Sequence, residues 1–363
     1  MKAYLVIEDG SIYAGRAFGS TGEAFGELIF NTSMTGYQEI IFDPSYKGQI
    51  VVMTYPLIGN YGINSQDIES YKIHLEGFVV KEKSKIYSNW RAEQSLDELF
   101  KQQGIIGIED IDTRKLTEFI RDKGAQKAGI FTTQLDKNIM VEKVKKSVSI
   151  VGRDIVKDVI KDEPYIWSSQ GKYKVVVIDC GVKYNILRLL AERNLKVVVY
   201  PATAPYQEIE KESPDGILIS NGPGDPEPLE YVIKNVSNLV EKYPVFGICL
   251  GQQILGQVFG GKTYKLKFGH HGANHPVKDL RTGKILITVQ NHGFCVDINS
   301  IKDPDIEITH MNLNDNTLEG IEHKKFPVFS VQFHPEDSPG PRDARYMFDK
   351  FYSLIENAKK NRH

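Results

Sequence analysis

Short apolar stretches separated by turns dominate the first 150 residues of the chain. A typical hairpin turn, Glu8-Asp9-Gly10, separates the first two of these stretches, and a capping box at Ser95-Leu96-Asp97-Glu98 begins a helical pattern. A second helical pattern begins near Thr113 and ends at Gly124. The pattern predicts strands at residues 3–7, 11–16, 27–30, 50–53 and 77–80. This part is therefore predicted to be a mixed α/β domain that opens with a sheet.

Apolar runs alternate with helical segments in the rest of the chain. The runs have the length and composition of buried strands and lie at 174–179, 196–200, 216–220 and 245–248. A helical pattern at 185–193 connects the first two. This alternation predicts a mostly parallel, doubly wound sheet with helices on both faces. Ligands of such sheets bind beyond the carboxyl ends of the strands.

The chain has 363 residues, a length that suits two domains. Residues 154–172 are polar, contain proline, serine and glycine, and show no sustained period, so they are interpreted as a linker. We therefore predict a smaller N-terminal α/β domain at 1–153 and a C-terminal α/β domain at 173–363.

Cys249 lies between a predicted strand and a predicted helix. Gly247 and Gly251 stand two residues either side of it, which is the glycine spacing of a nucleophile elbow with cysteine in place of serine. The first turn of a helix favours the thiolate, because the helix dipole and free N–H groups are positive there. A buried structural cysteine at the end of a core strand is the alternative.

His334 and Glu336 follow another apolar run near the end of the chain, Pro327 to Phe333. Side chains at i and i+2 of extended chain share a face, and Pro335 favours extended geometry at His334. Glu336 could therefore hold one ring nitrogen while the other faces Cys249, which gives a nucleophile, a general base and an orienting acid. The alternative for His334 alone is a residue that ends a strand.

A glycine-rich loop, Asn221-Gly222-Pro223-Gly224, follows the predicted strand at 216–220. Its tight turn can aim N–H groups inward. One of them, together with the N–H of Leu250, would form an oxyanion hole. The alternative is an ordinary surface turn.

Two further motifs suggest functions that their context disfavours. Gly256 to Thr263 fits the phosphate-loop pattern, but it follows a predicted helix and precedes a predicted strand, which inverts the required order. His270, His271 and His275 suggest a metal site, yet Gly272 and Pro276 argue against a continuous helix and no cysteine is nearby. We expect neither a nucleotide nor a metal at these positions.

Composition and charge limit the function classes. The net charge of −2 implies neither a nucleic acid nor a membrane partner. The first residues lack the apolar core of a signal peptide, no run is long enough to span a membrane, and the three cysteines form no disulfide framework. We expect a cytoplasmic protein.

Motifs of the C-terminal part resemble a known enzyme family. Gly-Ile-Cys-Leu-Gly-Gln-Gln around Cys249, Ser-Asn-Gly-Pro-Gly-Asp-Pro at 220–226 and Gln-Phe-His-Pro-Glu at 332–336 are similar to those of class I triad glutamine amidotransferases. The resemblance covers roughly residues 172–356. It implies the fold of that class.

Motifs of the N-terminal part narrow the resemblance. Residues 31–40, 43–46 and 110–117 are similar to the N-terminal domain of the carbamoyl phosphate synthetase small subunit family. Phe268 to Val277 and Gln290 to Phe294 also resemble segments of that family. The alternative for the second segment is a polar hairpin turn.

The resemblance implies a set of site residues. Cys249 would be the nucleophile, His334 the acid and base, and Glu336 the orienting carboxylate. Glutamine would be bound by Ser45, Gly222, Gly224, Leu250, Gln253, Asn291, Gly293 and Phe294.

The resemblance also implies an activity and a partner. Glutamine would be hydrolysed to glutamate and ammonia through a glutamyl thioester. A large synthetase subunit would use the ammonia to make carbamoyl phosphate for pyrimidine and arginine biosynthesis. ATP and magnesium are expected only on that partner, and no cofactor or metal is expected in this chain.

Two alternatives remain open from the residues. A cysteine peptidase or γ-glutamyl hydrolase on the same scaffold would keep the elbow and the histidine but would not need the matching N-terminal domain. A regulatory subunit without activity would keep the fold and lose the triad.

Overall fold

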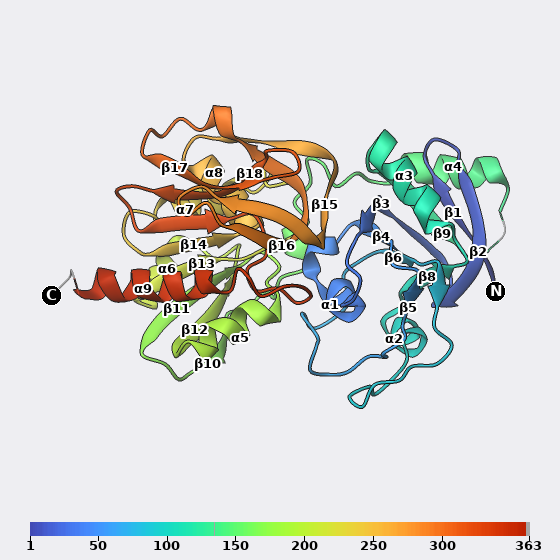
Figure 1. The fold of residues 1–363 in the computed structure, drawn as a ribbon, viewed down its shortest axis with the longest axis horizontal. Helices are drawn as coiled ribbons and strands as arrows, with labels where there is room; N and C mark the ends of the chain where they lie inside the picture. The colour runs from blue at the N-terminus through green and yellow to red at the C-terminus, as the bar shows by residue number, and fades with distance from the viewer. Residues whose placement is uncertain (134, 361–363) are drawn as a thin grey trace. The chain divides into compact units, whose positions relative to one another are not determined.

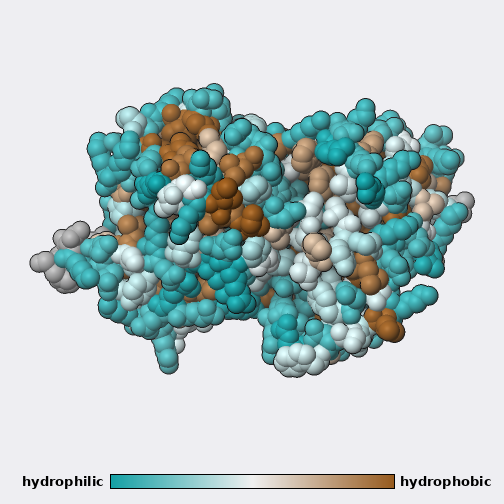
Figure 2. Space-filling model, viewed as in Figure 1, coloured by the Kyte–Doolittle hydropathy of each residue, from teal (hydrophilic) through white to brown (hydrophobic). Residues whose placement is uncertain are grey.

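The computed structural model describes residues 1–133 and 135–360 and divides the chain into two compact units (Figure 1). Unit 1 contains residues 1–153 and 267–272, and unit 2 contains the remainder of the chain. On the face seen in Figure 2, hydrophilic residues predominate and hydrophobic residues gather in separate patches. Among the described residues, none of the helices is long and apolar enough to cross a bilayer.

Unit 1 is built on a closed barrel. Its strands, in order around the barrel, are β1 (Lys2–Ile7), β2 (Ile12–Gly19), β8 (Ile106–Glu109), β6 (Gly77–Val79), β4 (Gln49–Met53), β3 (Glu23–Asn31) and β9 (Gln126–Phe131). The pairs β3/β4, β4/β6 and β6/β8 are parallel, and the other pairs are antiparallel. The predicted hairpin is present, with Val6 opposite Ile12 and Gly10 at φ 96°. Closure leaves the barrel without a free strand edge.

Helices and a short second sheet complete unit 1. They are α1 (Tyr37–Phe42), η1 (Pro44–Tyr46), α2 (Leu96–Gln103), α3 (Thr113–Lys123) and α4 (Lys137–Lys146), with the parallel pair β5 (Leu57–Ile58) and β7 (Glu82–Lys83). The predicted capping box is formed, since Ser95 Oγ accepts from the Glu98 N–H and the Glu98 carboxylate accepts from the Ser95 N–H. Leu116 and Ile120 of α3 share an apolar cluster with barrel residues such as Leu28 and Ile50.

Unit 2 is built on an open sheet of ten strands. In spatial order they are β10 (Tyr165–Ser168), β12 (Leu195–Pro201), β11 (Tyr173–Asp179), β13 (Gly216–Ile219), β14 (Val245–Ile248), β19 (Val328–Val331), β18 (Leu318–His323), β17 (Ile306–Asn312), β15 (Lys262–Asp279) and β16 (Ile285–Asp297). The run from β12 to β19 is parallel, as predicted. Strands β17 and β18 extend it with antiparallel pairings, and residues 267–272 of β15 belong to unit 1.

Helices cover both faces of this sheet. They are α5 (Tyr184–Glu192), α6 (Tyr206–Lys211), α7 (Glu230–Ser237), α8 (Leu250–Val258) and α9 (Tyr346–Lys360), with short η2 (Val156–Asp158) and η3 (Ile298–Ser300). Alternate residues of β11 point to opposite faces. Val175 and Val177 join a cluster with α5 and α9, whereas Val176 and Ile178 join a cluster with α6, α7 and α8. The sheet is therefore doubly wound.

The stretch interpreted as a linker contains regular structure. Four of its residues, Tyr165–Ser168, form β10 at the edge of the sheet and pair antiparallel with β12. The pairing is between residues about 30 positions apart, so the local sequence pattern did not reveal it.

Candidate active site

Cys249 lies at a sharp turn between a strand and a helix. It follows β14 and is the N-cap residue of α8, and its backbone has φ 53° and ψ −102°. A non-glycine residue in such a sparsely populated region costs roughly 1–3 kcal/mol, so the surrounding structure must hold it there. The Cys249 N–H donates to the Val331 carbonyl oxygen at 2.9 Å, which ties the turn to β19. The buried cysteine therefore stands at the carboxyl edge of the parallel strands.

Two glycines let the backbone pack closely around this turn. A Cβ at Gly251 would lie 2.3 Å from the Ile219 carbonyl oxygen. A Cβ at Gly222 would lie 2.1 Å from the Cys180 carbonyl oxygen and 2.8 Å from the Leu250 side chain. No side chain fits at such distances, so only glycine is accommodated. The glycine-rich loop and the start of α8 are consequently neighbours.

His334 and Glu336 follow β19 at the same edge of the sheet. His334 Nδ1 and Glu336 Oε1 are 2.6 Å apart, and both side chains are buried. Lys183 Nζ forms an ion pair of 3.1 Å with Glu336 Oε1 and donates to the Asp337 carbonyl oxygen at 2.5 Å. Asn185 Nδ2 donates to the Glu336 carbonyl oxygen at 2.6 Å. The buried carboxylate is therefore paired with charges of opposite sign, as burial requires.

These charges shift two pKa values. Burial alone would raise the pKa of Glu336, but the Lys183 ammonium and His334 outweigh it and hold the pKa below its usual range. Burial alone would lower the pKa of His334, but the charges of Glu336 and Cys249 outweigh it and raise the pKa above its ordinary value. The arrangement favours an ionised carboxylate beside a protonated imidazole.

The Cys249 thiol has polar neighbours on two strands. Its Sγ lies 3.7 Å from the Asn291 carbonyl oxygen on β16, and Gln332 Nε2 donates to Sγ at 3.5 Å. Nε2 of His334 has no hydrogen-bond partner within the part of the chain that the structure describes. The charge of Cys249 contributes to the raised pKa of this imidazole. Its Nε2 can therefore exchange a proton with a reacting group.

Residues expected to bind glutamine line β16 beside the thiol. Gln253 Nε2 of α8 donates to the Phe294 carbonyl oxygen at 2.8 Å and to Gln332 Oε1 at 3.2 Å. Lys265 Nζ lies 5.2 Å from the centroid of the Phe294 ring and would be 3.2 Å from a Cβ at Gly293. Residues 290–294 belong to β16, so the hairpin-turn alternative does not apply to them.

The glycine-rich loop presents its backbone next to the elbow. Gly224 has φ 84°, and Ser220 Oγ accepts from the Cys180 N–H at 2.9 Å. Leu250 is the first residue of α8, where a backbone N–H has no acceptor within its own helix. The contact of Gly222 with Leu250 places these two expected ligands side by side.

Ser45, the remaining expected ligand, belongs to unit 1. It is buried in η1, between Pro44 and Tyr46. Its backbone N–H donates to Asp43 Oδ1 at 2.9 Å.

The phosphate-loop pattern has the inverted context that the sequence predicted. Helix α8 ends at Val258, and β15 begins at Lys262. A Cβ at Gly261 would lie 2.8 Å from the Gly256 carbonyl oxygen, so this glycine closes the helix end. His270, His271 and His275 lie on β15, a strand rather than a helix.

Sequence reasoning missed Lys183, Asn185 and Gln332 as members of this site. All three lie close to the carboxyl end of a parallel strand, β11 for the first two and β19 for the third. Polar residues directly after predicted parallel strands were the available signal. The sequence assigned them no role because their contacts are with residues more than 80 positions away.

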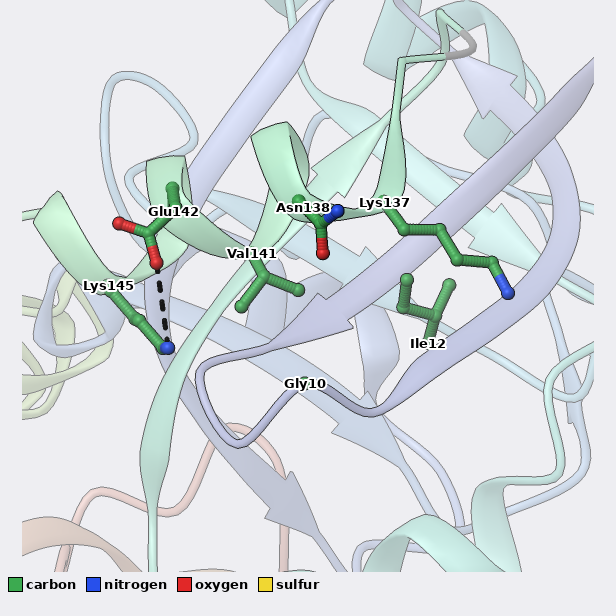
Figure 3. A pocket seen from close by; sticks show the side chains of 7 residues that line it. All are labelled: Gly10, Ile12, Lys137, Asn138, Val141, Glu142 and Lys145. Atoms are coloured by element: carbon green, nitrogen blue, oxygen red, sulfur yellow. Dashed lines mark ion pairs between the residues drawn. The ribbon is translucent and has the colours of Figure 1, made fainter.

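A surface cleft of unit 1 is a separate feature. Its volume is about 450 Å³, and Figure 3 shows the residues that line it, from the β1–β2 turn and from α4: Gly10, Ile12, Lys137, Asn138, Val141, Glu142 and Lys145. An ion pair of 3.6 Å joins Glu142 and Lys145 at one side. The lining residues include no cysteine, histidine or serine, so this cleft does not supply the chemistry found in unit 2.

Comparison with known proteins defines the class. The family model described as glutamine amidotransferase class-I matches residues 176–354, which contain Cys249, His334 and Glu336. Unit 2 is thus an amidotransferase domain of that class. A second model, described as carbamoyl-phosphate synthase small chain, CPSase domain, matches residues 5–130.

Whole-chain relatives define the family. The chain is 53% identical over 375 residues to the carbamoyl phosphate synthase small chain of Syntrophotalea carbinolica, covering 99% of this chain and 100% of that one. It is 53% identical over 368 residues to that of Aquifex aeolicus, with 98% and 99% covered. A crystal structure of a glutamine amidotransferase from Thermotoga maritima gives a TM-score of 0.37 at 20% identity, over 52% of this chain and 85% of that one. The chain belongs to the family of carbamoyl phosphate synthase small chains, the glutamine-hydrolysing amidotransferase subunits of that enzyme.

Proposed function

We propose that Cys249, His334 and Glu336 form a catalytic triad that hydrolyses glutamine to glutamate and ammonia, and that the ammonia passes to a large synthetase subunit for carbamoyl phosphate synthesis. The observation that carries the proposal is the strained, buried Cys249 at the strand–helix turn, with the His334–Glu336 pair at the same sheet edge. Strain of this kind is stored where a side chain must be held for reaction.

The first half of the reaction forms a thioester. The Cys249 thiolate attacks the side-chain amide carbon of glutamine, and the amide oxygen takes up the negative charge. N–H groups of Leu250 and of the glycine-rich loop would stabilise this oxyanion, an effect of about 3 kcal/mol for one donor. His334 then donates its Nε2 proton to the amide nitrogen, the C–N bond breaks, and ammonia leaves.

The second half releases glutamate. Neutral His334 takes a proton from a water molecule, and the hydroxide attacks the thioester carbon. The carbon–sulfur bond breaks, Cys249 departs as a thiolate, and His334 is again protonated. Glu336, held by Lys183, keeps the imidazole in one orientation and stabilises its charged form through both steps.

Glutamine would be held by the residues around the thiol. The Cys249 Sγ contacts the Asn291 carbonyl oxygen, and Gln253 is hydrogen-bonded to Phe294 and to Gln332, whose side chain donates to that Sγ. Within unit 2, Gly222, Gly224, Leu250 and Gly293 complete the proposed set. Their backbone groups suit the amide, amino and carboxylate ends of a small polar substrate.

The residues proposed for catalysis account for only one part of carbamoyl phosphate synthesis, so we propose a partner for the other part. The triad releases ammonia but cannot activate bicarbonate, and the phosphate-loop pattern lies at a helix end. We therefore place ATP and magnesium on the large subunit, with no cofactor on this chain. Ammonia in neutral water becomes mostly ammonium, which is not a nucleophile, so direct transfer to the partner preserves its reactivity.

Glutaminase assays with and without the large subunit test this function. The isolated chain should hydrolyse glutamine slowly, and the large subunit with bicarbonate and ATP should raise the rate by improving the alignment of the triad. Acid quenching during turnover should trap a glutamyl group on the peptide that contains Cys249, as seen by mass spectrometry. Full activity alone and no change on adding the partner would instead support an independent hydrolase.

A further inference from the structure

Three large apolar side chains lie exposed within five residues of unit 1. In the segment between β7 and α2, which we call the Trp90 loop (residues 84–93), Trp90 is 91% exposed, Ile86 79% and Tyr87 40%. Single exposed apolar residues are ordinary on a protein surface, whereas a group of them marks an interaction site. In Figure 1 the segment that joins β7 to α2 extends beyond the barrel strands.

Backbone hydrogen bonds fix the two ends of the Trp90 loop. The N–H groups of Ser84 and Ser88 donate to the carbonyl oxygens of Ile58 and Asn60 at 2.8 and 2.9 Å. At the other end, the Glu93 N–H donates to the Ile63 carbonyl oxygen at 2.8 Å. The loop is thus held along its length against residues 58–63.

Side chains hold the tip of the loop. Arg91 makes two hydrogen bonds of 2.9 Å to the Asp67 carboxylate. Gly62 has φ 71°, and a Cβ there would lie 2.7 Å from Ala92 Cβ and 2.9 Å from the Tyr87 ring. The glycine therefore allows Ala92 and Tyr87 to pack against the backbone of residue 62, while the Trp90 and Ile86 side chains face solvent. A loop ordered before binding loses little entropy when it binds.

The composition of the loop is that of a protein interface. Tryptophan, tyrosine and arginine are the residues enriched at interface hot spots. The exposed charged residues at the ends of the loop are of both signs, Lys81, Glu82, Lys85 and Glu93. The apolar side chains at its centre therefore determine the matching partner surface, which would have an apolar pocket.

We propose that the Trp90 loop is a docking element for the large synthetase subunit, with Trp90 and Ile86 inserted into an apolar pocket of that subunit. This inference rests on the proposed function, which supplies the partner. The loop lies within residues 5–130, the part matched by the carbamoyl-phosphate synthase small-chain model, and outside the part matched by the amidotransferase model. We therefore expect the Trp90 loop to bind the large synthetase subunit and to have no part in glutamine hydrolysis.

Binding measurements with the purified large subunit test the docking element. Trp90→Ala combined with Ile86→Ala should raise the dissociation constant by roughly thirtyfold or more, the size of a hot-spot loss. Glutamine hydrolysis by the isolated chain and its melting temperature should stay at wild-type values, because both side chains are exposed. Ile139→Ala, which removes a 51% exposed side chain from α4 of the same unit, is the matched control and should bind as the wild type does.

The outcomes separate this inference from the proposed function. If the wild-type chain does not bind the large subunit, the proposed function fails and the docking element with it. If the wild type binds and the double variant binds within twofold, only the docking element is overturned. Self-association of the wild type that the double variant loses, measured by sedimentation without the large subunit, would assign the loop to a second copy of this chain and also overturn the inference.

Discussion

The two units bury their apolar side chains in different ways, and the difference decides where chemistry can occur. The barrel of unit 1 pairs every strand on both sides, so its core closes around itself. The sheet of unit 2 is open, and the carboxyl ends of its parallel strands lie along one edge, where Cys249, His334 and Lys183 follow β14, β19 and β11. A run of parallel strands gathers the residues that follow them at one end of the sheet, whereas antiparallel pairs in the barrel of unit 1 place carboxyl ends of strands at both of its ends.

Glycines also have different roles in the two units. In unit 1 a Cβ at Gly107 would lie 2.3 Å from the Phe18 ring, so this glycine makes room for core packing. In unit 2 Gly222 and Gly251 make room for the turn that presents Cys249. The same steric property therefore serves stability in one unit and the candidate site in the other.

Replacement of the proposed nucleophile should have the largest effect, because it should separate glutamine-dependent from ammonia-dependent synthesis. Cys249→Ser should lower glutamine-dependent carbamoyl phosphate synthesis by the complex by at least about a thousandfold, because the hydroxyl is a far weaker nucleophile. Ammonia-dependent synthesis should survive, since the proposed function places the synthetase chemistry on the large subunit. Cys295→Ser is the control, because that thiol is buried, with a pKa raised by burial to about 12, and has no part in the triad. A Cys249→Ser complex that used glutamine at the wild-type rate would remove Cys249 from the mechanism.

The two partners of Cys249 should differ in importance. His334→Asn should remove glutaminase activity almost as completely as loss of the thiol, because His334 is the proton-transferring group of the proposed triad. Glu336→Gln should cost less, roughly ten- to a hundredfold, since the carboxylate only orients and stabilises the imidazole. Single-turnover formation of the thioester gives the comparison, and equal defects in the two variants would contradict these roles.

Matched glycine substitutions in the two units test the contrast directly. Gly222→Ala and Gly107→Ala should each lower the free energy of unfolding by roughly 1–3 kcal/mol, because each new methyl group must displace its neighbours. Only Gly222→Ala should also impair glutamine hydrolysis at 25 °C. Gly107→Ala is the matched control, since its methyl group would also meet close neighbours but lies in the core of unit 1 and outside the candidate site. Loss of glutaminase activity in folded Gly107→Ala would show that the units are not separable in this way.

The buried Glu336 should give a smaller, pH-dependent effect on stability. Its pKa is lower in the folded chain than in the unfolded one, so its contribution is complete above about pH 4.5 and declines as the pH falls below that value. The stability difference between the wild type and Glu336→Gln should therefore shrink by about 1 kcal/mol or more between pH 6 and the acid range. Urea unfolding at several pH values measures it, with exposed Glu241→Gln as the control. A difference that stayed constant with pH would contradict the ionised state of Glu336.

Local sequence patterns were sufficient for much of the molecule. The Glu8-Asp9-Gly10 turn, the Ser95 capping box and the strand–cysteine–helix order around Cys249 each depend on residues within a few positions of one another. Such features are fixed by backbone sterics and short-range hydrogen bonds, and they formed as the pattern predicted. The alternation of apolar runs and helices likewise predicted the parallel centre of the sheet in unit 2.

Tertiary structure alone decided the remaining features. The sequence predicted strands in unit 1 but not the closure of its barrel through β1 and β9, and it did not predict β10. It identified His334 and Glu336 but not Lys183, which lies 153 positions before Glu336 in the chain and forms an ion pair with it. Strand pairing and buried ion pairs depend on which distant segments meet, and that is settled only when the whole sheet assembles.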